Sequence, residues 1–170
     1  MKLKRFAVAL FVVVPLAVAG IAVAANVFGT AKPATAHFHD LGAAEAAGYG
    51  EFRDAQGIAC IELPGTGAMG VHYVNGSLVG DAVLDVRRPE ALVYERRGNH
   101  MHLVALEYIV FKDVWEDAGN MEPPRLFGRQ FDFTDSPNRF GIPPFYSLHA
   151  WAWKVNPEGD FFAWNPRVDC

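Results

Sequence analysis

Short stretches that are apolar or alternate between apolar and polar residues dominate the chain after residue 57. Such patterning predicts strands, because successive side chains of a strand point to opposite faces of a sheet. The stretches span residues 58–63, 68–74, 77–80, 91–95, 100–110 and 145–155. Asn75-Gly76 is a preferred pair for a two-residue hairpin turn, so we expect the strands on either side of it to pair. The polar residues 96–99 predict a second hairpin with a longer loop.

Two short segments favour helix instead. Asp40 is a good N-cap for the alanine-rich residues 41–49, and residues 113–119 fit a single helical turn. The stretches rich in Pro and Gly at 121–128 and 136–145 are typical of loops with aromatic anchors. The sequence therefore predicts a β-rich α+β or all-β fold, an antiparallel barrel or sandwich with a short N-terminal helix.

A basic start and a long apolar run open the chain. Residues 1–5 carry three basic side chains, and the run 6–25 has the layout of a secretory signal and nearly the length of a membrane anchor. We expect residues 1–31 to be a signal peptide or N-terminal anchor, 32–39 a linker and 40–170 a single β-rich extracytoplasmic domain. The protein is thus predicted to be secreted or held in the cell envelope, with membrane contact only through an uncleaved N-terminal segment.

Three small-x-small sites fit signal cleavage, and they end at Ala24, Ala31 and Ala36. A cut at the last of them would make His37 the N-terminal residue. An N-terminal histidine that binds copper through its amine and ring resembles the histidine brace of lytic polysaccharide monooxygenases. All three sites stay open on the sequence alone.

Without its first 31 residues the chain is acidic. That segment holds Lys2, Lys4 and Arg5 and no acidic residue, so 12 of the 15 basic side chains remain against 19 acidic ones, a formal charge of −7. This balance argues against nucleic acid as a partner.

The two cysteines, Cys60 and Cys170, stand far apart in the sequence. In an oxidising compartment they predict a disulfide that ties the C-terminus to the body of the domain. A catalytic thiol is the alternative for either residue.

Two histidines and a glutamate follow one another in the stretch 100–110. The spacing of His100, His102 and Glu107 resembles the first metal-binding motif of the cupins, and the segment around His149 matches their second motif loosely. Strict alternation would point Glu107 away from both earlier histidines. We expect His100 and His102, next to a polar loop, to be exposed.

Glu107 interrupts an otherwise apolar strand, so its side chain is predicted to be buried and to need a partner. An arginine such as Arg53 or Arg129 would give a plain ion pair. Alternatively, Glu107 meets His72 and His149, the two histidines in the middle of other predicted strands. That cluster could support acid–base chemistry or hold a divalent metal.

Trp151 and Trp153 alternate with His149 and are expected on the same strand face, where two indoles could wall a pocket for an apolar ligand. We therefore predict His72, Glu107, His149, Trp151 and Trp153 as ligand-binding residues, the first three of them also as metal ligands. The sequence has no Gly-x-Ser-x-Gly elbow, Walker loop or His-Glu-x-x-His motif.

Several segments together resemble a family of exported bacterial proteins without an assigned activity. They include GVHYVNGSLVGD, LVALEY and LHAWAWKVNP, and the likeness covers most of the chain after residue 40. The resemblance implies an extracytoplasmic bacterial protein and brings no catalytic residues with it. The expected function is small-molecule binding at a buried His/Glu site. A metal-dependent or acid–base enzyme and a structural envelope protein are the alternatives.

Overall fold

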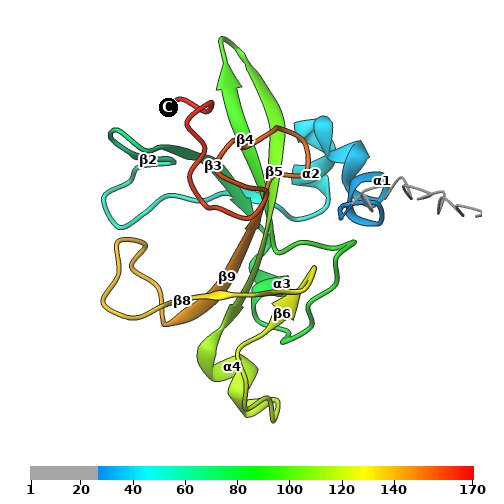
Figure 1. Ribbon diagram of the computed structural model, residues 1–170, viewed down its shortest axis with the longest axis vertical. Coiled ribbons are helices and arrows are strands. Elements are labelled where there is room, and N and C mark those ends of the chain that lie inside the picture. Colours follow the sequence, from blue (N-terminus) through cyan, green and yellow to red (C-terminus); the bar gives the residue numbers. More distant parts are fainter. Residues whose placement is uncertain (1–26) are drawn as a thin grey trace, which may run out of the picture.

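One antiparallel sheet organises the computed structural model, which describes residues 27–170 (Figure 1). The strands run in the order β1-β3-β4-β5-β9-β8, and β2 also pairs with β3. Their bounds are β1 Gly50–Glu51, β2 Cys60–Leu63, β3 Gly67–Val74, β4 Ala91–Arg97, β5 His100–Phe111, β8 Asp132–Thr134 and β9 Phe145–Ala150. A separate ribbon joins β6 (Arg125–Leu126) to β7 (Arg129–Gln130). The predicted β-rich antiparallel fold is confirmed, and the sheet does not close into a barrel.

Short helices flank this sheet. They are α1 (Ala31–Thr35), the 3-10 turn η1 (Ala36–His39), α2 (Leu41–Ala46), α3 (Gly76–Val79) and α4 (Lys112–Asp117). The predicted cap of α2 is present, because the Asp40 carboxylate accepts a hydrogen bond from Gly42 N at 2.9 Å. In Figure 1, α1 and α2 lie beside the β4–β5 hairpin, and α4 lies at the end of β5 away from the hairpin turn.

The segment predicted as a linker, 32–39, is instead part of the folded domain, as α1 and η1. Phe28, Ala31 and Phe38 are buried in the main core. The Phe28 ring stands edge-on to Phe127 at 5.6 Å. The small, Pro-containing composition suggested a linker, but two aromatic side chains supply enough apolar surface to hold this segment against the sheet.

The burial of Phe28 predicts where a signal peptide can be cleaved. The predicted signal or anchor falls largely in residues 1–26, outside the described residues. If the segment is removed, we expect a cut after Ala24, because cuts after Ala31 or Ala36 would remove Phe28 from the core. Mass spectrometry of the exported protein should then give a chain that begins at Ala25. A chain beginning at Lys32 or His37 would contradict this prediction.

The hairpin predicted at Asn75-Gly76 does not form. The Asn75 side chain accepts from Ser77 N at 3.1 Å and caps α3, and its amide donates to Ala47 O at 3.1 Å. Residues 77–80, predicted as a strand, belong to this helical turn and its end, and β3 pairs with β4. Asparagine favours both hairpin turns and helix N-caps, so the dipeptide does not decide between them.

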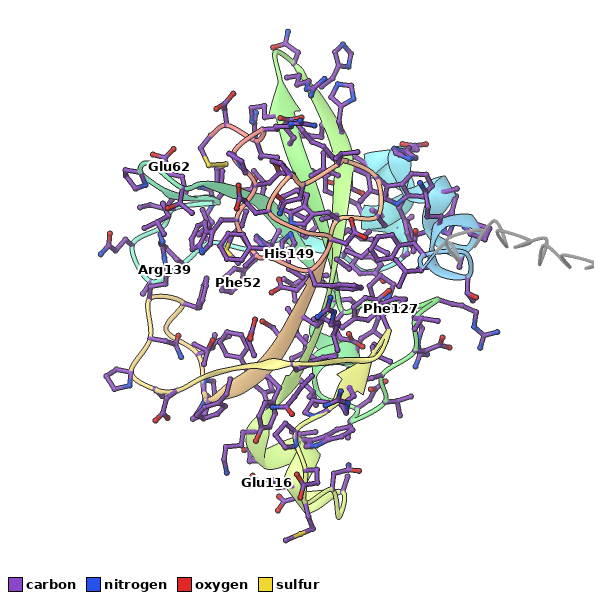
Figure 2. All side chains as sticks on the ribbon, viewed as in Figure 1. Phe52, Glu62, Glu116, Phe127, Arg139 and His149 are labelled. Atoms are coloured by element: carbon purple, nitrogen blue, oxygen red, sulfur yellow. A yellow bond between two sulfur atoms is a disulfide. The ribbon has the colours of Figure 1, made fainter. Side chains whose placement is uncertain are left out.

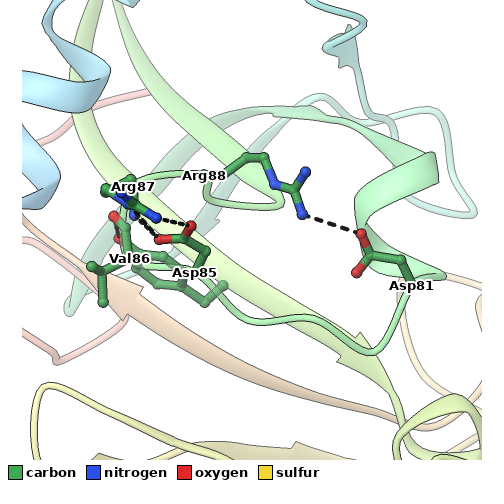
Figure 3. A network of polar contacts seen from close by, with 6 residues as sticks. Asp81, Asp85, Val86, Arg87 and Arg88 are labelled. Atoms are coloured by element: carbon green, nitrogen blue, oxygen red, sulfur yellow. Dashed lines mark hydrogen bonds and ion pairs between the residues drawn. The ribbon is translucent and has the colours of Figure 1, made fainter.

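The loop that leads from α3 to β4 carries ion pairs (Figure 3). Asp85 accepts from the Arg87 guanidinium at 3.0 and 3.2 Å, and Arg88 lies 3.5 Å from Asp81. Exposed pairs of this kind contribute little stability. A stronger anchor is the buried Tyr108, whose hydroxyl donates to Val86 O at 2.8 Å. The loop is thereby fixed at its exit into β4.

The β4–β5 hairpin gives the sheet two different faces. Leu92 and Leu106 pair across it and point into the main core, while Ala91 and Glu107 pair on the opposite face. The register shifts at Val104, which is an extra residue on β5. A bulge of this kind reverses the alternation on either side of it.

The bulge overturns the predicted orientation of Glu107. Paired residues share a sheet face, so His102, opposite Glu95, lies on the same face as Glu107. Their separation of five positions in the sequence still corresponds to roughly 15 Å along the strand. His100 and His102 are exposed near the hairpin turn, as predicted.

The C-terminal segment returns to β3. The predicted disulfide is present, with Cys60 and Cys170 joined at a Cα–Cα distance of 5.5 Å. Ahead of it, Asn165 exchanges two backbone hydrogen bonds with Ala68, at 3.0 and 3.2 Å. Within residues 27–170, no helix is long and apolar enough to cross a membrane.

Candidate functional site

Glu107 stands at the centre of the sheet, between Ala91 on β4 and His149 on β9. His72 comes from β3, one strand beyond β4, where it pairs with Val93. The small side chain of Ala91 leaves room above β4, so His72 and Glu107 can meet across it. His72 Nε2 lies 3.1 Å from Glu107 Oε2.

Both members of this pair are shielded from water, with exposed side-chain fractions of 8% for His72 and 7% for Glu107. Burial by itself would raise the pKa of Glu107. The charge and hydrogen bond of His72 and a hydrogen bond from the Ser147 side chain oppose burial and hold the pKa below its usual value. Glu107 is therefore a buried carboxylate, as predicted, and it is ionised at neutral pH.

The arginines considered as partners lie elsewhere. Arg53 pairs with Glu51, and the guanidinium of Arg129 lies 5.6 Å from the Phe161 ring centroid. Instead, Glu107 pairs with His72 from β3 and lies opposite His149 on β9, the two histidines of the alternative prediction.

His149 completes the cluster and has an unusual environment. Burial lowers the pKa of His149 to about 4 against the opposing effect of the Glu107 charge, so its ring is neutral at physiological pH. Neither ring nitrogen has a hydrogen-bond partner among the residues the structure describes. The ring lies 4.7 Å from Trp151 and 5.8 Å from the His72 ring. A buried imidazole with both nitrogens unpaired costs free energy, which marks this position as one that needs an explanation.

The two tryptophans are not arranged as alternation suggested, because β9 ends at Ala150. Trp151 packs beside His149, and its indole N–H donates to Phe162 O at 2.6 Å. Trp153 turns toward the N-terminal helices, 4.5 Å from the His39 ring and with the Lys32 ammonium 4.9 Å from its centroid. Neither tryptophan lines the pocket described next.

A pocket of about 410 Å³ opens over the face of the sheet that carries Glu107. His72, Glu107 and Ser147 line it from the strands. The other lining residues are Phe52, Met69, Val74, Gly76, Val79, Ile109, Phe111, Asp132, Thr134, Phe140, Ile142, Phe145 and Ala163. His149 is absent from this lining and lies beside Glu107 on the adjacent strand. The pocket is thus mostly apolar, with the hydrogen-bonded His72–Glu107 pair in its lining.

Sequence reasoning missed the aromatic walls. Phe52 and Phe140 come from loops, where no periodicity reveals which residues face a cavity. A half-buried ion pair joins these loops, because Arg139 donates to the Asp54 carboxylate at 2.9 Å. In Figure 2, Arg139 lies toward the edge of the molecule, whereas Phe52 and His149 project near its centre.

Comparison of the chain with protein-family models, curated proteins and solved structures found no match. The function of the site therefore has to be argued from its own residues. The resemblance to a family of exported bacterial proteins stays a prediction.

A second buried carboxyl group, Glu90, directly precedes β4. Its Oε2 accepts from Ile109 N at 3.0 Å, while Oε1 has no partner among the described residues. Burial raises the pKa of Glu90 to about 8, against the weaker effect of that hydrogen bond. Glu90 is thus largely protonated at neutral pH and accepts a hydrogen bond from the β5 backbone beside the start of β4.

The raised pKa of Glu90 predicts how the stability of the protein changes with pH. Because folding raises the pKa of Glu90, its contribution to the free energy of unfolding is complete below about pH 4.5. That contribution declines until the pH passes about 8. We expect wild type to lose roughly 1.4 kcal/mol of this contribution per pH unit in that window. Glu90→Gln should lack this loss, measured by urea unfolding between pH 5 and 9. Exposed Glu62→Gln should follow wild type, and parallel curves for Glu90→Gln and wild type would contradict the assignment.

Proposed function

We propose that the chain is an exported domain that binds a small, mainly apolar molecule with one polar group. The observation that carries this proposal is the His72–Glu107 pair, a buried hydrogen-bonded pair that lines a mostly apolar pocket. Ligand sites commonly combine apolar walls with a few fixed polar groups, and pockets of 300 to 1,000 Å³ are typical of them. The Cys60–Cys170 disulfide and the predicted signal support an extracytoplasmic location.

The residues that line the pocket suggest which chemical groups the ligand carries. Aromatic rings such as Phe52, Phe140 and Phe145 favour a flat or branched apolar body. Glu107 accepts hydrogen bonds, so a hydroxyl or amino group on the ligand would be stabilised beside it. Small phenols and short aliphatic alcohols are therefore the first probes.

Filling the pocket tests the proposal. Gly76 lines the pocket, its φ lies outside the left-handed region, and a Cβ there would meet no atom within 4 Å. Calorimetric titration with p-cresol and 1-hexanol should show binding to wild type, at least a tenfold loss in Gly76→Phe, and no change in Gly50→Phe. Gly50 is a matched control, because its Cβ position is equally open and it lies outside the pocket. Equal affinities in all three proteins, or no binding to wild type, would overturn the proposal.

An acid–base enzyme is the second candidate, and one observation favours it. His72 faces the pocket while Glu107 holds its Nε2, an arrangement that fixes an imidazole for proton transfer. Conversion of a bound molecule by wild type, lost in His72→Phe, would support this candidate. A ligand recovered unchanged after long incubation would argue for binding alone.

A further inference from the structure

Three side chains from three strands place metal-ligating atoms together beneath the pocket. One ligand atom each of His72, Glu107 and His149 lies within 4.8 Å of the other two, and all three residues are buried. His149 is only 3% exposed, and both of its nitrogens lack a partner among the described residues. A hydrogen-bonded core histidine would leave at most one nitrogen unpaired, so ordinary packing does not account for this ring.

We infer that His72, Glu107 and His149 form a binding site for a divalent transition-metal ion. Two imidazoles and one carboxylate suit zinc and its neighbours, whereas calcium and magnesium prefer oxygen ligands alone. The separation of 3.1 Å between His72 Nε2 and Glu107 Oε2 is close to the roughly 3.3 Å between two ligands of a tetrahedral zinc ion. A small movement of the His149 ring toward the other two side chains would give the ion its third ligand.

Neighbouring residues hold two of these ligands in place. Ser147 bonds the Glu107 carboxylate, and the His149 ring packs against Trp151, which Phe162 O fixes through its indole N–H. Partners of this kind orient metal ligands and are part of most metal sites. The backbone register of β5 and β9 places Glu107 directly opposite His149, so two of the ligands are set by strand pairing alone.

The open side of the site faces the pocket. His72 and Glu107 line that pocket, and His149 lies beside Glu107 on the adjacent strand, so a fourth ligand would come from the pocket side. This part of the inference rests on the proposed function. It also sharpens the class of ligand, because one carboxylate only partly neutralises a divalent ion. An apolar molecule with an acidic oxygen, such as an aromatic carboxylate, would then be favoured.

Metal alone provides the first test. Untagged protein expressed from its full-length gene is stripped with a chelator and titrated with ZnCl₂, and the bound metal is counted by elemental analysis. We expect about one equivalent for wild type and for the control His100→Ala/His102→Ala. His149→Leu and Glu107→Gln should each weaken zinc binding by more than the roughly 10- to 100-fold typical of losing an outer-shell partner. Binding unchanged in His149→Leu, or lost in the exposed-histidine control, would overturn the inference.

Two further measurements use Co(II) and the pocket-filling variant Gly76→Phe. Co(II) bound to wild type should give the visible absorption of a site with nitrogen and oxygen ligands, which does not depend on any variant folding. Gly76→Phe should keep the metal and lose 4-methylbenzoate, whereas His149→Leu should lose the metal and keep p-cresol. Absence of zinc and cobalt binding together with retained p-cresol binding would reject the metal site and leave the proposed function standing.

Discussion

Glu107→Ala is expected to lower the free energy of unfolding by about 3 to 5 kcal/mol, the cost typical of removing one partner from a buried ion pair. The substitution leaves His72 buried without its carboxylate and enlarges the space above Ala91. Urea unfolding monitored by tryptophan fluorescence at pH 7 measures the change.

Two further variants separate the charge effect from lost packing. Replacing both members, as in His72→Leu/Glu107→Leu, should recover much of the stability, because no unpaired charge stays buried. Glu62→Ala, an exposed glutamate on β2, should change stability by no more than about 0.5 kcal/mol. If Glu107→Ala were as stable as wild type, the carboxylate would not be buried and paired as the structure has it.

Loss of the disulfide is the other large effect. Cys60→Ser/Cys170→Ser is expected to lower the free energy of unfolding by about 4 to 5 kcal/mol, because the bond closes a loop of 110 residues in the unfolded chain. The fold itself should persist, since Asn165 still pairs with Ala68 and Val168 stays buried. Urea unfolding with and without a reductant measures this change.

The reductant supplies the control for this prediction. It should shift the midpoint of wild type to that of the double variant and leave the double variant unchanged. Mass spectrometry after thiol alkylation confirms that reduction is complete. A wild-type midpoint that does not move after full reduction would contradict the prediction.

Part of the site can be predicted from the sequence, because a buried polar residue interrupts an otherwise apolar strand. Glu107 stands out as one charged residue in an apolar strand, and His72 and His149 stand out in the same way. Their meeting could be suggested only as an alternative, since it depends on β4 lying between β3 and β5 and on β9 pairing with β5. Strand order arises from long-range pairing, which local patterns do not encode.

Other features lacked a local signal. The bulge at Val104 exchanges the faces of β5, yet nothing in a run of Leu, Val and Ala marks the extra residue. The alternation of His149, Trp151 and Trp153 continues past the last residue of β9, so the pattern suggested a strand where the chain turns away. Two aromatic residues of the pocket wall, Phe52 and Phe140, come from loops. The N-terminal helices were obscured by a composition typical of linkers.

The pocket over His72 and Glu107 is proposed to hold a small molecule. Native mass spectrometry of untagged protein from its own host, with wild type beside Gly76→Phe and Gly50→Phe, can detect such a molecule. We expect wild type and Gly50→Phe to carry the same non-covalent small molecule and Gly76→Phe to have lost it. Bare polypeptide masses for all three proteins would contradict the account.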